Sequence, residues 1–112
     1  MRLAFVLLSV VLLAATVDVP EAVSRSKELT AAERGHLIAQ QRCASCHAVE
    51  PGAERPRPRA PGFATREMRH TAGLEGRLDQ LTRKGHYDMP PMSLQPSEVS
   101  DLLAYIDSLG GR

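Results

Sequence analysis

Five consecutive residues, Cys43-Ala44-Ser45-Cys46-His47, constrain this chain more than any other stretch. Their spacing, C-x-x-C-H, is the attachment signature of a c-type haem. Two thiols three positions apart on one turn of helix can each add across a vinyl group of the same porphyrin, and the adjoining imidazole can reach the iron from one side. The motif therefore predicts one covalently bound haem c, held by Cys43 and Cys46 with His47 as the proximal iron ligand.

A C-x-x-C pair has two other common uses, in zinc sites and in thioredoxin-like dithiols. A structural zinc site uses about four Cys and His ligands in paired spacing, and this chain has no second pair. A thioredoxin-like dithiol lies near a βαβ pattern, and no alternating apolar run here indicates a strand. Both alternatives are therefore weaker than haem attachment.

Length and composition describe one small domain that needs an additional stabiliser. The chain has 112 residues and a formal charge of +1, and its two cysteines both lie in the motif, so there is no disulfide framework. A single core of this size is marginal on its own. A covalent haem would provide this additional stabilisation, because helices can bury their apolar faces against it. The near-neutral charge gives no argument for a nucleic-acid partner.

Residues 1–24 are predicted to be an export signal. Arg2 gives a positive start, and Leu3–Val17 is apolar apart from one Ser and one Thr. That length suits the apolar region of a signal peptide and falls short of the roughly 20 residues that span a bilayer. An uncleaved membrane anchor is the alternative, since no clean cleavage site follows. Either outcome places residues 25–112 in the periplasm, with membrane contact only through the N-terminus.

The remaining pattern predicts an all-α domain with about three main helices and long loops. Thr30-Ala31-Ala32-Glu33 is a capping box that opens a helix running into the haem motif. A second, short helix is marked by leucines at three- and four-residue spacing and ends before Gly85. Pro96 suits the first position of the last helix. The leucines of the second helix are Leu74, Leu78 and Leu81, and the apolar face of the last consists of Val99, Leu102, Leu103, Ile106 and Leu109.

Residues 50–62 and 85–95 are predicted loops. The first contains four prolines, which remove backbone donors and exclude a regular helix. Arg55, Arg57 and Arg59 alternate with prolines there, a pattern that favours an extended, exposed, basic segment. A docking patch for an acidic partner and a plain solvated loop both fit this pattern, and the solvated loop is the simpler interpretation.

Taken together and in this order, the motifs of residues 30–109 resemble those of class I cytochromes c. Residues 32–47 resemble the first helix of that family as it runs into the haem motif. Gly35 falls where the family places a small residue, so that the first and last helices can cross closely. Tyr105 matches the aromatic position of the closing helix. The resemblance implies a small cytochrome c fold whose helices and loops wrap around one covalent haem.

The resemblance also implies neighbours for the haem. Ala60-Pro61-Gly62-Phe63 is similar to the segment whose proline carbonyl accepts a hydrogen bond from the proximal histidine, so Pro61 is expected to bind His47 Nδ1. Met89-Pro90-Pro91 is similar to the distal-ligand loop of the small bacterial members and lies seven residues before Pro96. The resemblance therefore favours Met89 as the sixth iron ligand, beside an apolar wall expected from Phe63, Leu78 and Leu81.

Other residues could supply the sixth ligand. Met92 is the main rival of Met89, and His86 would give a bis-histidine haem of lower potential. The full set of candidates is Met68, His70, His86, Met89 and Met92.

Ligation by His and Met predicts an electron carrier rather than an enzyme. A thioether is a soft ligand and raises the reduction potential of the iron. A saturated iron has no position for a substrate, and the sequence shows no general base or nucleophile. We therefore expect a monomeric periplasmic carrier with redox proteins as partners. The alternatives are a haem subunit or dedicated electron acceptor of a dehydrogenase or oxidase complex, and a gas-binding sensor whose methionine is displaced.

Overall fold

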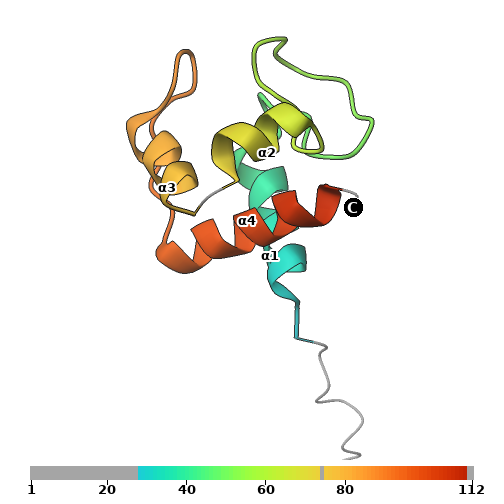
Figure 1. The fold of residues 1–112 in the computed structure, drawn as a ribbon, viewed down its shortest axis with the longest axis vertical. Coiled ribbons are helices and arrows are strands. Elements are labelled where there is room, and N and C mark those ends of the chain that lie inside the picture. Colours follow the sequence, from blue (N-terminus) through green and yellow to red (C-terminus); the bar gives the residue numbers. More distant parts are fainter. Residues whose placement is uncertain (1–27, 74, 111–112) are drawn as a thin grey trace, which may run out of the picture.

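The structure, a computed structural model, describes residues 28–73 and 75–110. The expected export signal at residues 1–24 and Leu74 of the expected second helix lie outside these ranges. The described residues form four α-helices and no strand, which confirms the all-α prediction; the helices are α1 (Ala31–Arg42), α2 (Arg66–Ala72), α3 (Glu75–Lys84) and α4 (Pro96–Leu109) (Figure 1). None of these four is both long enough and apolar enough to cross a bilayer.

Helix α1 begins at the predicted capping box. The Thr30 hydroxyl accepts a hydrogen bond from the Glu33 N–H at 3.2 Å, and the Glu33 carboxylate accepts one from the Thr30 N–H at 2.7 Å. Two of the four unpaired N–H groups at the helix start are thereby satisfied. The helix ends at Arg42, where the N–H of Cys43 still donates to the Ala39 carbonyl at 2.9 Å.

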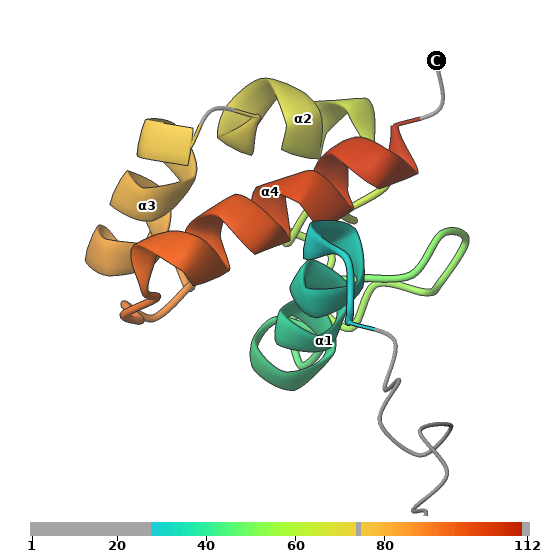
Figure 2. The ribbon, with the colours of Figure 1, turned by 90° about the horizontal axis from the view of Figure 1, so that it is seen from below.

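Helices α1 and α4 cross closely at Gly35, as predicted (Figure 2). A Cβ atom on Gly35 would lie 1.9 Å from the Asp101 carbonyl oxygen and 2.9 Å from Tyr105 Cβ. Only glycine allows the two backbones to approach this far. Arg34 reinforces the crossing from the neighbouring position, since its guanidinium donates to both Asp101 carboxylate oxygens at 2.7 and 2.8 Å.

Helix α4 is the apolar centre of the fold. Pro96 occupies its first turn, and the Gln95 N–H donates to the Glu98 carboxylate at 2.7 Å. The largest fully buried side chains of the described residues all lie on this helix, namely Val99, Leu102 and Ile106. Gly110 follows the last helical residue. The predicted face and end of the last helix are therefore confirmed.

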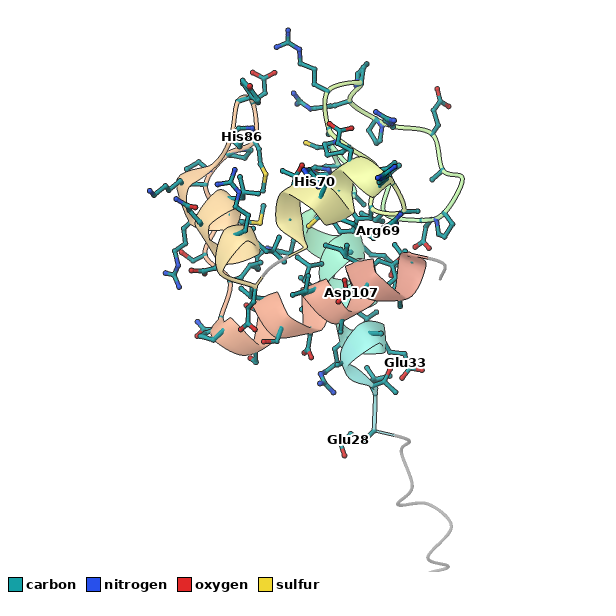
Figure 3. All side chains as sticks on the ribbon, in the orientation of Figure 1. Glu28, Glu33, Arg69, His70, His86 and Asp107 are labelled. Atoms are coloured by element: carbon teal, nitrogen blue, oxygen red, sulfur yellow. The ribbon has the colours of Figure 1, made fainter. Side chains whose placement is uncertain are left out.

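Helix α2 adds a fourth helix that the sequence pattern did not predict. The Thr65 hydroxyl caps it by accepting from the Met68 N–H at 3.2 Å, and Met68 and Ala72 form its buried face. Arg69 of α2 reaches the end of α4, where a Cβ atom on Gly110 would lie 2.7 Å from Arg69 Cδ. This places a positive charge near the C-terminal end of α4, where the helix dipole favours it. Figure 3 labels Arg69 beside this end of the helix.

Helix α3 begins at Glu75 and ends at Lys84, immediately before Gly85, as predicted. Leu78 is its buried leucine. The two expected loops, residues 50–62 and 85–95, contain no helix. They rise at the same end of the molecule, beyond α2 and α3 (Figure 1).

Candidate haem site

A cavity of about 490 Å³ opens between the two long loops, α2 and α3, and has α4 as its floor. Its volume lies within the range of roughly 300–1,000 Å³ that is usual for cofactor pockets. Most of the side chains around it are apolar. They include Phe63 before α2, Leu78 and Leu81 on α3, and Leu102 and Ile106 on α4.

The C-x-x-C-H motif forms one wall of this cavity. It lies just beyond the end of α1, in a turn held by two hydrogen bonds to the Cys43 carbonyl, from the Cys46 N–H at 3.1 Å and from the His47 N–H at 2.9 Å. This turn brings both sulfur atoms and the imidazole to the same side, and all three residues line the cavity. The two cysteines are free thiols and form no disulfide with each other.

Cys43 is the more enclosed of the two cysteines, with 7% of its surface exposed. Burial raises the pKa of its thiol to about 11, because an apolar environment disfavours the thiolate. The residue is therefore uncharged at neutral pH. A thioether is also uncharged, so haem attachment at Cys43 places no charge in the apolar wall.

His47 is held in a fixed orientation. Its Nδ1 lies 2.9 Å from the Pro61 carbonyl oxygen. A carbonyl can only accept a hydrogen bond, so Nδ1 is the donor and Nε2 is the nitrogen left with a lone pair for a metal. Phe63 packs against the same imidazole, with ring centroids 5.4 Å apart. The predicted contact between His47 and Pro61 is thus confirmed.

Met89 reaches the cavity from the loop after α3. Its backbone pairs with that of His86 in both directions, at 2.9 and 3.2 Å, which closes a tight turn. Gly85 allows this turn to fold back: its φ is +71°, and a Cβ atom there would lie 2.5 Å from the Met89 carbonyl oxygen. The turn is anchored to α3 by a 2.8 Å hydrogen bond from the Met92 N–H to the Thr82 carbonyl.

These residues fit a covalent haem. Two thiols and an oriented imidazole share one wall, the other walls are largely apolar, and a methionine reaches the cavity from a separate loop. Within the described residues, no three Cys, His, Asp or Glu side chains gather as a metal site.

The comparisons with known proteins agree with this geometry. Residues 30–106 match the family model described as cytochrome c oxidase, cbb3-type, subunit III. Cytochrome c-552 of Bradyrhizobium diazoefficiens is 35% identical over 88 residues, which covers 77% of this chain and 84% of that protein. No solved structure matches the chain significantly.

This chain belongs to the small monohaem c-type cytochromes. Membership implies a covalently bound haem c, with Cys43 and Cys46 in the spacing that its attachment uses. It also makes the protein an electron-carrier haem protein in the broad sense.

The candidates for the sixth ligand occupy different places in the cytochrome. Met89, Met68 and His86 line the cavity, and the first of these is half-buried. Met92 packs against the hydrophobic core and is not among the residues that line the cavity. His70 is exposed on α2 and does not line it either, whereas His86 lies on the loop after α3 (Figure 3).

Sequence reasoning missed several residues of this wall. The sequence indicates Met68 only as a candidate ligand, yet this residue is 6% exposed and forms part of the cavity lining from α2. Thr82 is buried, and its hydroxyl donates a hydrogen bond to the Leu78 carbonyl at 3.0 Å. The hydroxyl is therefore paired within α3. The four-residue spacing of Met68 and Ala72 after Thr65, a capping residue, is the signal that could have revealed α2.

Proposed function

We propose that this cytochrome is a periplasmic one-electron carrier whose haem iron is bound by His47 and Met89. The observation that carries the proposal is the shared cavity. It brings the attachment motif, on the turn after α1, and Met89, on the loop after α3, to one space of cofactor size. Bound haem c supplies an iron couple that gains or loses a single electron.

The chain's own residues would set the properties of that couple. The Pro61 carbonyl orients His47 and increases the basicity of its other ring nitrogen. The Met89 thioether favours the ferrous state and so raises the reduction potential. Phe63, Leu78 and Leu81 line the same cavity and keep water away from it, which disfavours the additional charge of the ferric state.

The proposal also includes export of the cytochrome domain across the cytoplasmic membrane. Residues 1–24 carry the signal-like pattern and precede the domain of residues 25–112. We expect a monomer that exchanges electrons with redox proteins outside the cytoplasmic membrane. Fractionation of cells that produce the full chain should recover the haem protein in the periplasmic fraction, or in the membrane fraction if the N-terminus is retained as an anchor.

The sixth ligand is tested with a matched pair of variants, Met89→Ala and Met92→Ala. In the ferric wild type, sulfur–iron ligation should give its weak near-infrared band. Met89→Ala should abolish this band, open the ferrous iron to carbon monoxide and lower the potential by on the order of 100 mV, within the ~0.8 V that axial ligands span. Met92→Ala should leave all three properties nearly unchanged, because Met92 packs against the core.

The reverse result would make Met92 the ligand and leave the carrier function in place. If neither variant alters the spectrum, the iron is ligated differently and the carrier proposal fails. Reaction of the ferrous wild type with carbon monoxide would favour the gas-binding sensor instead.

A second candidate function is that of a haem subunit in an oxidase complex. It is favoured by the matched family model, whose description names subunit III of a cbb3-type oxidase. Size-exclusion chromatography of the protein from whole native cells dissolved in detergent distinguishes the two functions. A free carrier elutes alone, whereas a subunit co-elutes with oxidase activity and further haem.

A further inference from the structure

The short segment that leads into α2 carries the acceptor for the expected iron ligand. Residues 61–65, Pro-Gly-Phe-Ala-Thr, begin with the carbonyl that lies 2.9 Å from His47 Nδ1. They end at Thr65, whose hydroxyl caps α2. The orientation of the imidazole therefore depends on how firmly this segment holds the Pro61 carbonyl.

Gly62 is the most flexible residue of the segment, and it directly follows that carbonyl. Its φ is not positive, so the turn does not require glycine there. A Cβ atom on Gly62 would lie 3.4 Å from Thr65 Cγ2 and 3.6 Å from the Ala48 carbonyl oxygen, which are ordinary contact distances. Glycine nevertheless has the greatest backbone freedom of all residues. Rotation about its φ and ψ angles would turn the Pro61 carbonyl away from His47 unless the next peptide group is fixed.

The next peptide group joins Gly62 to Phe63, both of them buried, and it is fixed at both ends. Its carbonyl accepts two hydrogen bonds from Thr65, from the hydroxyl at 2.6 Å and from the backbone N–H at 3.0 Å. Its N–H donates to the carbonyl of Ala48, the residue after His47, at 2.9 Å. These hydrogen bonds connect the flexible glycine both to α2 and to the chain that carries the imidazole.

The Thr65 hydroxyl does more than cap a helix. It accepts a hydrogen bond from the Met68 N–H at 3.2 Å while it donates to the Gly62 carbonyl. A hydroxyl can do both at once, because it has one proton and two lone pairs. Capping needs only the acceptor. The donated hydrogen bond is therefore a separate contribution of the same side chain.

We propose that Thr65 is a positioning residue for the iron ligand His47. By holding the Gly62 carbonyl, it keeps the preceding Pro61 carbonyl in place to accept the imidazole N–H. The inference rests on the proposed ligation by His47. A well-placed acceptor increases the basicity of the imidazole, and a more basic ligand favours the ferric state. Thr65 does not line the cavity, so it lowers the reduction potential through these two carbonyls.

The test uses the ferrous holoprotein with isotopically labelled histidine, in which NMR follows exchange of the His47 Nδ1 proton with solvent. Thr65→Val removes both hydrogen bonds of the hydroxyl and nearly preserves its shape. Exchange should become about fivefold faster relative to the amide of Leu102 in α4, which reports global unfolding. The ferrous fraction at a fixed electrode potential should rise, because a less basic imidazole disfavours ferric iron.

Three further variants separate positioning from helix capping. Thr65→Ser keeps donor and acceptor and should behave as wild type. Thr65→Asp still accepts from the Met68 N–H but cannot donate to the Gly62 carbonyl. It should keep α2 capped and the protein folded, yet still accelerate exchange of the Nδ1 proton. Thr30→Val removes the corresponding cap hydroxyl from α1 and should lower the melting temperature without changing the relative exchange rate.

A double variant, Gly62→Ala with Thr65→Val, tests the role of the flexible glycine directly. Alanine restricts the backbone at a position that has room for it. It should therefore return the relative exchange rate to within about twofold of wild type, and the ferrous fraction with it. A role in capping alone predicts no such rescue, because alanine at position 62 does not replace the cap of α2.

Two results would overturn the proposal while leaving the carrier function in place. Equal acceleration at His47 and Leu102 in every Thr65 variant would mean that the threonine only stabilises the fold. A lower ferrous fraction in Thr65→Val would indicate water in the cavity rather than a less basic ligand. Absence of a protected His47 Nδ1 proton in wild type would instead contradict ligation by His47, and absence of any one-electron wave would contradict the carrier function.

Discussion

The α1–α4 crossing and the two loops around the cavity are stabilised in different ways. At the crossing, the polar groups find partners within the chain: Arg34 binds Asp101, and the Tyr105 hydroxyl donates to the Val49 carbonyl at 2.8 Å. In the loops, Tyr87 lines the cavity and remains 87% exposed. The crossing is thus closed by the chain itself, whereas the loops surround a space that a cofactor fills.

This difference separates two kinds of mutational effect. Residues at the crossing should determine the free energy of unfolding, since they contact other parts of the chain in the folded state. Residues of the loop after α3 should determine the spectrum and potential of the haem, because that loop carries the proposed ligand Met89. A variant at the crossing that changed the haem spectrum would contradict this division, as would a variant of the loop after α3 that changed only the free energy of unfolding.

The largest expected effect is at the crossing, in Gly35→Ala. The new methyl group would lie 1.9 Å from the Asp101 carbonyl oxygen, and a backbone atom cannot turn away as a flexible side chain can. We expect a cost of about 3 kcal/mol, at the upper end of the range for overpacked sites. A larger residue such as Leu should cost at least as much. Denaturant titration measures the loss, and the haem spectrum of the folded fraction should stay unchanged.

Gly76→Ala is the matched control. Gly76 is the second residue of α3, and a Cβ atom there would meet no atom within 4 Å. Alanine is the better helix former, so this variant should be more stable by about 0.5–1 kcal/mol. If both glycine variants changed stability alike, the close approach at Gly35 would not be what holds the crossing.

A smaller loss of stability and a larger spectral change are expected for Gly85→Ala. Its φ of +71° strains any other residue, and the added methyl group would press on the Met89 carbonyl oxygen. Gly52→Ala has the same strain, with a φ of +73°, but no neighbour within 4 Å. Each should lose about 1–2 kcal/mol to strain. Only Gly85→Ala should weaken the near-infrared band of the ferric protein and lower its potential.

The crossing was largely predictable from the sequence because its signals are local. A capping box at Thr30 and the apolar spacing of the last helix each involve residues a few positions apart. The close approach of the two helices at Gly35 was reached through the family resemblance, because Gly35 and Asp101 are far apart in sequence. The attachment motif is equally local. The contact between His47 and Pro61 spans 14 positions and was reached through resemblance to a family rather than through periodicity.

The cavity wall was less predictable because its residues come together only in the folded chain. Helix α2 has seven residues, too few for a clear apolar period, and so Met68 was not expected in the lining. The left-handed conformation of Tyr87 carries no compositional signal, since turns of this kind usually contain Gly or Asn. Its strain depends on the pairing of His86 with Met89, which the fold determines.

The smallest expected effect is that of the ion pair across the helix crossing. Hydrogen bonding to Arg34 lowers the pKa of Asp101 below its ordinary value, so the pair's contribution is complete above about pH 4 and is lost as the pH falls through the folded-state pKa. Arg34→Gln should therefore lower the melting temperature slightly at pH 7, and its difference from wild type should shrink towards pH 2.

Comparison with Glu50 and with a control variant of Arg77 assigns this pH dependence to the ion pair between Arg34 and Asp101. The pKa of Glu50 is also lowered, chiefly by its hydrogen bond with His36, so wild type and variant share that part of the acid sensitivity. Arg77 is exposed, donates to the Gln80 side chain and forms no ion pair with another residue that the structure describes. Arg77→Gln should therefore show no such pH dependence. Arg34 also donates to the Leu29 carbonyl at 2.6 Å. A difference that persists unchanged at pH 2 would therefore assign the stabilisation to this neutral hydrogen bond, because protonation of Asp101 does not affect it.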